Sequence, residues 1–267
     1  MIKIDKNWLK KLYQPPRKSR KGENGIVLIA AGSEKYHGSL ILCATMAAKL
    51  VDLVYVYASK ENFALIKKLR EGLAEFIRVE ERDPDSVGMT VWNSDAILLG
   101  PGLMPNEKTK KLVNGILRAF PEKKIVLDAG ALRVVDLKLL HKNCVLAPHA
   151  GEFQAMFKKK ATAQNARLIS KKYPGVIVLK GWQSYVCQNG KVWCNVIGNQ
   201  GMTKGGTGDV LSGLIVGLLA KNEPLLAAGA GLYANGAAGD ALWKKFGFNY
   251  SASELVDEVR KVLAQSF

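Results

Sequence analysis

The sequence predicts an α/β protein in which a mostly parallel β-sheet carries helices on both faces. Short apolar runs typical of buried strands alternate with helical segments up to about residue 180. This alternation favours parallel strands joined by crossover helices, and uniformly apolar strands indicate a sheet covered on both faces. Its 267 residues, 48% of them hydrophobic, include no linker, repeat or low-complexity segment. We therefore expect a single domain over 1–267.

The elements follow from local patterns taken in order. A polar, basic stretch opens the chain, and Pro15-Pro16 ends its short helix. Apolar, β-rich runs that stop at Gly, Pro or Asp predict strands at 26–31, 53–57, 75–79, 95–99, 124–127, 144–147 and 176–180. Segments of helical character predict helices at 40–50, 62–70, 107–120 and 161–172, and over most of the chain from Thr207 onward.

Asn189-Gly190 predicts a two-residue hairpin turn between two short strands. In that register Cys187 faces Val192 and Cys194 faces Tyr185, so the two cysteines are diagonal and too far apart for a disulfide. The four cysteines form no CxxC pair. With no signal peptide and no apolar run of membrane length, we expect a reduced, cytoplasmic protein and no membrane partner.

The net charge of +16 arises from 39 Lys and Arg against 23 Asp and Glu. The basic residues are scattered, often as Lys-Lys pairs, over predicted helix faces, and no nucleic-acid-binding motif accompanies them. We interpret this distribution as a solvated surface that also steers anionic nucleotides. Nucleic acid is therefore not expected as a partner.

A glycine-rich loop between 198 and 209 is the stretch most typical of a binding site. Four glycines fall within eight residues (GMTKGGTG), and Asp209 follows at the start of an apolar helix. The unpaired N–H groups of such a helix end suit a phosphate. A carboxylate repels phosphate, so Asp209 indicates a site where a hydroxyl loses its proton and receives a phosphoryl group. The structural alternative is an N-cap at Thr207 with a first-turn Asp favoured by the helix dipole.

Further motifs directly follow the predicted strands. They are Ser33, Gly100-Pro101-Gly102-Leu103, Asp128, His149 and Lys180. Since ligands bind at the carboxyl edge of open α/β sheets, we expect these motifs to converge there. Singly, each has a structural explanation, such as a turn, a helix cap or a structural histidine. The absence of GxGxxG after the first strand, and of a Walker A sequence, excludes an ordinary dinucleotide-binding domain and a P-loop enzyme.

These motifs together resemble the ADP/ATP-dependent NAD(P)H-hydrate dehydratases, a family with the ribokinase-like fold. The segments that carry the resemblance are KGENG at 21–25, GS at 32–33, GPGL at 100–103, PHAGE at 148–152 and GNQGMTKGGTGDVLSG at 198–213. The resemblance implies a three-layer sandwich and a lyase (hydro-lyase) that repairs hydrated NADH or NADPH (NADHX or NADPHX). ADP or ATP phosphorylates the ring hydroxyl, and phosphate then leaves to restore NAD(P)H.

The resemblance also implies roles for individual residues. Asp209 is the catalytic base, and the anion hole consists of the N–H groups of Gly205, Gly206, Thr207 and Gly208. The adenine nucleotide is bound by Lys180, Gly181, Trp182, Gln183, Ser184 and Gly208. The hydrated substrate contacts Ser39, Gly102, His149 and Asp209. No residue is expected to form a metal site, because Mg²⁺ arrives with the nucleotide and is held largely by phosphates and water.

Two expectations concern assembly and partners. We expect a homo-oligomer, although core packing explains the small-residue C-terminal helices as well as a subunit contact does. Members of the family often carry a fused epimerase domain, for which this chain is too short, so we expect a separate NAD(P)HX epimerase to work with it.

Several positions depart from the family pattern. Ser39 stands where Ala is usual, Gln200 where Pro is, and Ser184 where Thr is. Gly130 replaces an Asp (DAGAL for DADAL), which leaves the role of that second carboxylate open. Lys204 replaces a small residue beside the anion loop, where a cation either helps to hold phosphate or shifts the nucleotide preference.

Three other functions are weighed. A ribokinase-like kinase of a small alcohol, such as hydroxyethylthiazole, would use the same loop and base but release a stable phosphate ester. A non-enzymatic nucleotide-binding protein gains nothing from a carboxylate at the anion site. Nucleic-acid binding rests only on net charge.

Overall fold

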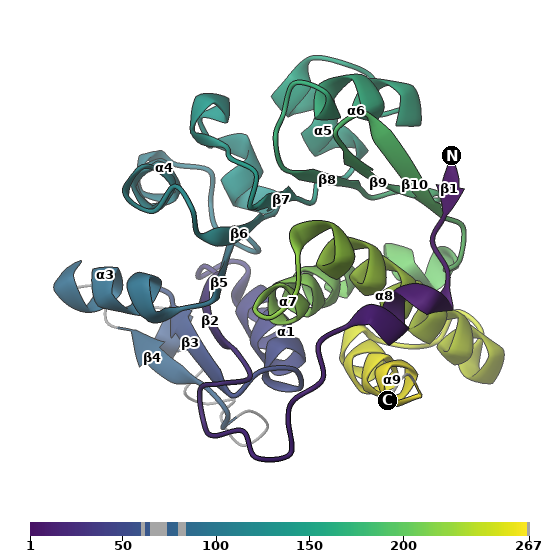
Figure 1. Ribbon diagram of the computed structural model, residues 1–267, viewed down its shortest axis with the longest axis horizontal. Coiled ribbons are helices and arrows are strands. Elements are labelled where there is room, and N and C mark those ends of the chain that lie inside the picture. Colours follow the sequence, from purple (N-terminus) through teal and green to yellow (C-terminus); the bar gives the residue numbers. More distant parts are fainter. Residues whose placement is uncertain (60–61, 65–73, 80–83, 266–267) are drawn as a thin grey trace.

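A computed structural model describes residues 1–59, 62–64, 74–79 and 84–265. Within them the strands form a ten-stranded sheet in the order β1-β10-β9-β8-β7-β6-β5-β2-β3-β4 (Figure 1). Neighbouring strands are parallel except that β9 runs antiparallel to both β8 and β10. The strands are β1 (Ile2–Lys3), β2 (Ile26–Ala30), β3 (Leu53–Tyr57), β4 (Ile77–Val79), β5 (Ala96–Leu99), β6 (Lys124–Leu127), β7 (Cys144–Leu146), β8 (Val176–Leu179), β9 (Ser184–Gln188) and β10 (Lys191–Asn195).

Helices cover both faces of this sheet, which confirms the predicted three-layer architecture (Figure 1). One layer contains α1 (His37–Ala48), α7 (Thr207–Leu219), α8 (Pro224–Phe246) and α9 (Ala252–Ala264). The other contains α3 (Pro84–Asn93), α4 (Glu107–Ala119), α5 (Ala150–Phe157) and α6 (Ala163–Ser170). Short 3₁₀ helices are η1 (Lys6–Lys11), η3 (Ala129–Arg133), η4 (Leu137–Leu139) and η5 (Gln200–Thr203). No helix in the described ranges is both long enough and apolar enough to span a bilayer.

The apolar strands supply two hydrophobic cores at once. In β2, Val27 and Ile29 face the core under α1 and α7, whereas Leu28 and Ala30 face the core under α3 and α4. Successive side chains of a strand point to opposite faces, so a strand covered on both faces must be apolar at every position. This is the physical reason that the strand predictions lie within two residues of the observed bounds.

The predicted hairpin is confirmed, including its register. Cys187 pairs with Val192 and Cys194 with Tyr185 across β9 and β10. All four cysteines are buried free thiols.

Sequence reasoning missed α3 and β1, and for α5 it predicted only a helix that ends at the lysine run 158–160, without a start. Helix α5 begins directly after His149, in the segment that was interpreted as a motif. Strand β1 has two residues and exists because it pairs with β10, almost the whole chain away. Of the helix predicted at 62–70, residues 62–64 are helical, and the remainder lies outside the described residues.

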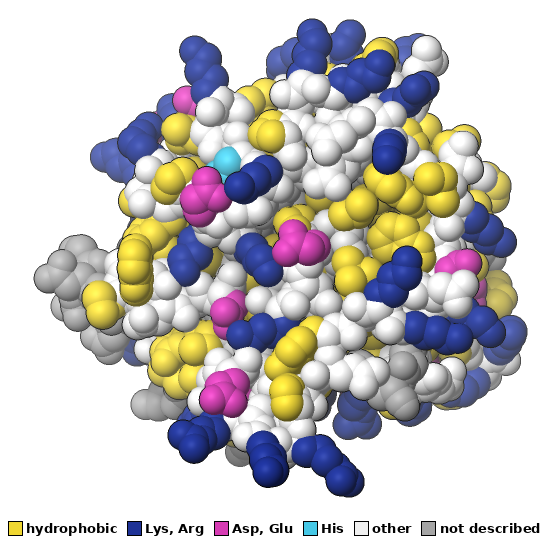
Figure 2. Space-filling model, in the orientation of Figure 1, with side chains coloured by type: hydrophobic (Ala, Val, Ile, Leu, Met, Phe, Trp, Pro, Cys, Tyr) yellow, Lys and Arg dark blue, Asp and Glu magenta, His cyan; other side chains and the backbone are white. Residues whose placement is uncertain are grey.

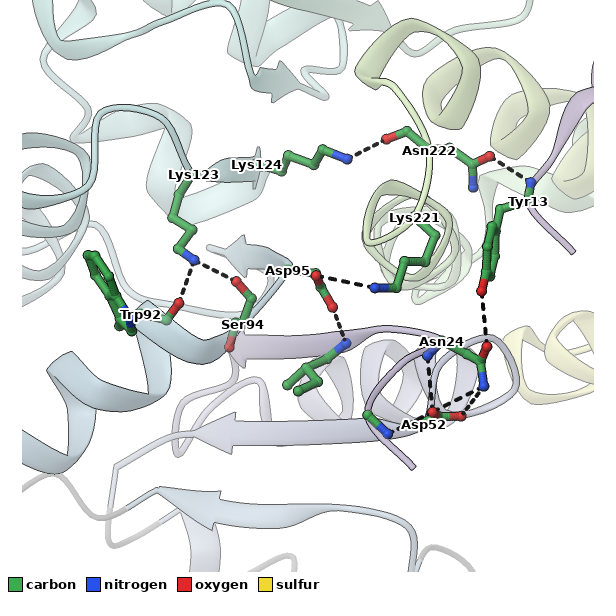
Figure 3. Close-up of polar contacts among 12 residues, drawn as sticks. Tyr13, Asn24, Asp52, Trp92, Ser94, Asp95, Lys123, Lys124, Lys221 and Asn222 are labelled. Atoms are coloured by element: carbon green, nitrogen blue, oxygen red, sulfur yellow. Dashed lines mark hydrogen bonds and ion pairs between the residues drawn. The ribbon is translucent and has the colours of Figure 1, made fainter. Parts of the chain in front are cut away.

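Several basic residues hold together the amino edge of the sheet, opposite the predicted site. The Lys124 Nζ donates to the carbonyl of Asn222 at 2.9 Å, and Lys221 pairs with Asp95 at 3.4 Å (Figure 3). The Asn222 side chain also accepts from the backbone N–H of Tyr13 at 2.8 Å (Figure 3). These contacts fasten the N-terminal segment to the end of α7, so part of the positive charge has a structural role.

Candidate active site

The carboxyl ends of the central strands are tied to one another by backbone hydrogen bonds. The N–H of Gly32 donates to Pro101 at 2.7 Å, that of Asp128 to Leu99 at 3.1 Å, and that of Lys180 to Pro148 at 2.9 Å. The loops after β2, β5, β6, β7 and β8 therefore share one edge, as the motif positions predicted. Helix α7 begins beside this edge.

The glycine-rich loop enters α7 through a backbone conformation that favours glycine. Gly206 is the N-cap residue, with φ +93° and ψ −20°, and an added Cβ would lie 2.5 Å from Leu42. The hydroxyl of Thr207 lies 2.7 Å from the Met202 carbonyl, which fixes the loop against η5. The N–H of Thr207 donates to Lys204 at 3.3 Å, whereas those of Gly205, Gly206 and Gly208 have no acceptor in the described part of the chain. The loop thus presents free donors at a positive helix end.

Asp209 lies in the first turn of α7 next to the start of α1. Burial raises the pKa of Asp209 to about 6, while the hydroxyl of Ser39, which donates to the carboxylate, lowers it. The negative charge of Asp128 raises this pKa and the positive charge of Lys180 lowers it. The result is a carboxylate that is ionised at neutral pH yet basic enough to accept a proton.

Close packing of α7 on α1 brings Ser39 and Asp209 together. At Gly213 an added Cβ would lie only 2.6 Å from the carbonyl oxygen of Cys43. The thiol of Cys43 in turn donates to the Asp209 carbonyl at 3.2 Å. The small residues of α7 therefore have a packing function, because they allow the two helix backbones to approach closely.

Gly102 packs against Ser39 from the loop after β5. Its φ is +69°, and an added Cβ would lie 2.9 Å from the Ser39 hydroxyl oxygen and 2.7 Å from the Tyr36 carbonyl. Only glycine fits this position without displacing α1. Three of the residues predicted to contact substrate, Ser39, Gly102 and Asp209, therefore form one cluster.

A buried polar network lies beside this cluster. Lys180 pairs with Asp128 at 2.7 Å, and Ser212 donates to the other carboxylate oxygen of Asp128 at 2.5 Å. Asp128 also caps η3 by accepting from the N–H of Ala129 at 2.8 Å. An added Cβ on Gly208 would lie 3.8 Å from the Lys180 ammonium, so this cation borders the anion loop. Asp128 was expected at this edge, with a helix cap as the structural alternative, and its ion pair with Lys180 is visible only in the fold.

No carboxylate can occupy position 130 as the backbone stands. An added Cβ on Gly130 would lie 2.0 Å from the carbonyl oxygen of Leu103. The Asp that the family resemblance implies there would require the loop after β5 to move. Asp128 is the carboxylate whose charge acts on Asp209 beside the anion loop.

His149 is both a helix cap and part of the site. Its Nδ1 accepts from the N–H groups of Gly151 at 3.0 Å and Glu152 at 3.3 Å, which places the ring proton on Nε2. Nε2 lies 3.3 Å from a carboxylate oxygen of Glu152. The ring is about half exposed and lines the cavity described next. The structural and the functional interpretations of His149 are thus compatible.

A cavity of about 450 Å³ opens beside the anion loop. Among the predicted nucleotide-binding residues, its lining includes Lys180, Gly181, Trp182, Ser184 and Gly208. Gln183 is absent from the lining, and its side chain accepts from the hydroxyl of Tyr185 at 2.8 Å instead. The Ser184 hydroxyl donates to the Gly181 carbonyl at 3.1 Å and closes the turn that carries Trp182.

The cavity also has walls that sequence reasoning did not anticipate. Asn195 ends the second strand of the hairpin, Ile197 and Asn199 follow it, and Leu232, Asn235 and Gly236 come from α8. The sequence offered one signal for this wall, since the glycine-rich stretch from 198 to 209 closely follows the hairpin. Residues on α8 gave no signal, because their apolar surroundings are typical of any core helix.

Lys204 corrects one expectation about the loop. Its ammonium donates to the carbonyls of Phe248 and Tyr250, at 2.7 Å for Tyr250, and lies 4.2 Å from the centre of the Phe248 ring. The cation therefore fastens the loop to the α8–α9 connection rather than supplying a free charge at the anion site. Carbonyl oxygens and aromatic faces already compensate it.

Two further observations bear on ligands. Within the described residues no group of three or more His, Cys, Asp and Glu side chains is arranged to hold a metal ion. On the face seen in Figure 2, Lys and Arg side chains are dispersed, with acidic and apolar side chains between them. That dispersal does not form the continuous basic stripe typical of nucleic-acid binding.

The chain is similar to proteins of a known family. The family described as NAD(P)H-hydrate dehydratase matches residues 27–261. An ADP-dependent (S)-NAD(P)H-hydrate dehydratase of Nitrosopumilus maritimus is 36% identical over 273 residues, covering 96% of this chain and 94% of that protein. A bifunctional NAD(P)H-hydrate repair enzyme of Methanocaldococcus jannaschii is 35% identical over 262 residues and 96% of this chain. The chain spans about half (51%) of that longer relative.

A solved structure matches over the full length. The ADP/ATP-dependent NAD(P)H-hydrate dehydratase of Bacillus subtilis, co-crystallised with ATP and Mg²⁺, superposes with a TM-score of 0.83 at 26% identity. The match covers 100% of this chain and 99% of that one. The ribokinase-like architecture expected from the sequence is therefore confirmed.

Proposed function

This chain belongs to the NAD(P)H-hydrate dehydratase family, and we propose that it uses an adenine nucleotide to return hydrated NADH or NADPH to NADH or NADPH. The overall change is loss of water from the hydrated nicotinamide ring. Hydroxide is a poor leaving group and phosphate is a good one. Transfer of a phosphoryl group to the ring hydroxyl therefore makes the elimination feasible.

The observation that carries this proposal is Asp209 beside the free N–H groups of Gly205, Gly206 and Gly208. In the first step the ring hydroxyl oxygen attacks the terminal phosphorus of the nucleotide, and Asp209 takes the hydroxyl proton. The bond from that phosphorus to the bridging oxygen breaks, and the loop N–H groups stabilise the transferring phosphoryl group. Thr207 can join them by exchanging its long bond to Lys204 for the phosphate.

In the second step the bond between the ring carbon and the ester oxygen breaks. The electron pair leaves with phosphate, a proton leaves the neighbouring ring carbon, and the double bond of the dihydronicotinamide returns. NAD(P)H, phosphate and the nucleotide shortened by one phosphoryl group then dissociate. A kinase would stop after the first step, because its phosphate ester has no such elimination open to it.

The two substrates approach from different sides of the first turn of α7. We assign the nucleotide to the cavity lined by Lys180, Gly181, Trp182 and Ser184. We assign the hydrated ring to the cluster of Ser39, Gly102 and Asp209, with His149 at its border. Lys180 lies between the sites, where its charge faces both Asp128 and the anion loop.

Mg²⁺ is expected to enter with the nucleotide and to neutralise phosphate charge. The donor set fits this arrangement, because Asp128 is already engaged by Lys180 and Ser212 and the described residues contain no preformed metal cluster. Phosphate oxygens and water would therefore supply most of its ligands. ADP and ATP both remain candidate donors, since related enzymes are named for one or for both.

The setting of the reaction is also proposed. A single domain over 1–267, a cytoplasmic location and a homo-oligomeric state fit a repair enzyme for dinucleotides. Relatives named as bifunctional repair enzymes suggest cooperation with an NAD(P)HX epimerase that presents the reactive epimer.

An absorbance time course tests the function. The protein is mixed with hydrated NADH or NADPH, Mg²⁺ and either ADP or ATP, and the reduced-nicotinamide absorption band is followed. Nucleotide-dependent return of that band is expected, and the more effective nucleotide identifies the donor. Release of a stable phosphate ester from a small alcohol, without return of the band, would support the kinase instead.

A further inference from the structure

Two buried amide oxygens in the cavity lack hydrogen-bond partners. Asn195 is 4% exposed and Asn235 is 6% exposed, and among the described residues the Oδ1 atom of each finds no donor. Both residues line the cavity of about 450 Å³ beside the anion loop. A buried acceptor without a donor costs on the order of 1–3 kcal/mol, so such atoms indicate a missing ligand group.

The orientation of Asn195 is determined by its neighbours. It is the last residue of β10, and its Nδ2 donates to the carbonyl of Ile197 at 3.1 Å. A carbonyl oxygen can only accept, so the amide cannot be flipped and Oδ1 must be the atom left without a partner. Asn195 therefore presents an acceptor.

Asn235 belongs to α8 and lies near the same place. The next residue, Gly236, packs so closely that an added Cβ would lie 2.9 Å from the Ile197 carbonyl oxygen. That carbonyl is the one that Asn195 holds. The two amide groups thus come from a strand end and a helix that meet at Ile197.

The surroundings of these acceptors suit a flat aromatic base. Ile197, Met202, Leu211 and Leu232 line the same cavity with apolar side chains. Trp182 lines the cavity and is 92% exposed, so its ring is free to stack on a base.

We propose that Asn195 and Asn235 accept hydrogen bonds from the exocyclic amino group of adenine and so select adenine nucleotides. This inference rests on the proposed function, because it deepens the nucleotide site named there. An amino group carries two hydrogens, one for each unpaired oxygen. Guanine and hypoxanthine carry a carbonyl oxygen at that position, which would face two acceptors and leave all three unpaired.

Nucleotide binding measured by calorimetry tests the assignment without any hydrated substrate. The ligands are ADP, inosine diphosphate and purine riboside diphosphate, in which a carbonyl or a hydrogen replaces the amino group. We expect the wild-type protein to bind ADP at least about tenfold more tightly than either analogue. In Asn195→Leu and Asn235→Leu this preference should fall to about threefold or less, because an acceptor has been removed.

Controls separate this assignment from other causes. Asn249→Leu changes an exposed asparagine outside the cavity and should keep the full preference. If Asn195→Leu does not fold, Asn235→Leu alone decides, through its ratio of affinity for ADP to affinity for the two analogues. A folded variant that keeps the wild-type preference for ADP over the two analogues overturns the proposal. The proposal is also overturned if a substitution instead changes the discrimination between ADP and 2′-deoxy-ADP, since the oxygens would then face the ribose.

Failure of the two proposals would look different. No binding of any adenine nucleotide would overturn the proposed function together with this assignment. Tight binding of ADP and inosine diphosphate alike would overturn only the role of the two asparagines. Return of the nicotinamide band with ADP would then still support the dehydratase.

Discussion

Asp209 combines a raised pKa with a position at the positive end of a helix. The helix dipole favours its charge, whereas burial and the nearby Asp128 disfavour it. Burial is the largest of these effects, so the pKa of Asp209 rises to about 6. At neutral pH the residue is mostly ionised, which is the state that a general base requires.

Asp209→Asn tests this role directly. The amide keeps the size of the carboxylate but cannot take a proton, so turnover should fall by at least about 100-fold while ADP still binds. The reduced-nicotinamide assay measures the first quantity and calorimetry the second. Near-normal turnover would exclude Asp209 as the base.

Ser39 should set the pH at which Asp209 works. Since Asp209 must be deprotonated, activity should rise with pH through about 6 in the wild-type enzyme. The Ser39 hydroxyl lowers the pKa of Asp209, so Ser39→Ala should move the acidic limb of the kcat/KM profile to higher pH. Ser19→Ala, in the N-terminal segment, should leave the profile in place. If the acidic limb of the kcat/KM profile stays in place in Ser39→Ala, the Ser39 hydroxyl does not lower the pKa of Asp209.

At the scale of elements, the approach of α7 to α1 decides whether the site exists. Asp209 is on one helix and Ser39 on the other, and no loop connects them locally. Gly213 allows the backbones to touch at Cys43. Any side chain there must separate the two helices.

Matched glycine substitutions test that contact. Gly213→Ala should destabilise the fold by about 1–3 kcal/mol, because the new methyl group overlaps the Cys43 carbonyl. Gly115→Ala, in α4 with open space around its Cβ position, should stabilise by about 0.5–1 kcal/mol. Urea unfolding measures both. Equal effects at the two positions would mean that the α1–α7 contact adapts freely.

Two lysines near the anion loop should behave differently. Lys180→Met leaves the buried Asp128 without its cation and should cost about 3–5 kcal/mol of stability as well as ADP affinity. Lys204→Met loses hydrogen bonds to the α8–α9 connection, so it should cost about 1 kcal/mol but leave ADP affinity unchanged. Thermal unfolding and calorimetry separate these outcomes. Loss of ADP affinity in Lys204→Met would mean that the Lys204 ammonium contributes to phosphate binding.

For the whole molecule, the buried charge of Asp209 is a cost to stability. Its folded-state pKa of about 6 exceeds the ordinary value of 3.8, so the penalty is fully present above pH 6. Protonation relieves the penalty as the pH falls from 6 toward 4. Function and stability therefore conflict at this residue.

Unfolding of Asp209→Asn across pH measures that conflict. At pH 7.5 the variant should be more stable than the wild type by about 3 kcal/mol, since the amide carries no charge to bury. The difference should shrink as the pH falls through 6 and nearly vanish near 4. A constant difference over this range would show that another effect of the substitution is responsible.

The alternation of strands and helices, the edge that carries the motifs and the loop at the start of α7 were all predictable from the sequence. Each depends on residues close together in the chain: a doubly covered strand must be apolar throughout, and a glycine-rich turn before a helix exposes N–H groups. The start of helix α5 escaped prediction because its N-cap is an unusual histidine.

Only the tertiary structure decided which distant groups meet. Ser212 reaches Asp128 across 84 positions of the chain, and Lys204 reaches Tyr250 across 46. Asn195 and Asn235 acquire unpaired oxygens in one cavity because a strand end packs on a helix. Burial, ion pairing and free space are properties of the packed chain, and no local pattern encodes them. For that reason the sequence predicted a candidate base and a candidate anion loop, and the fold supplied the groups that surround them.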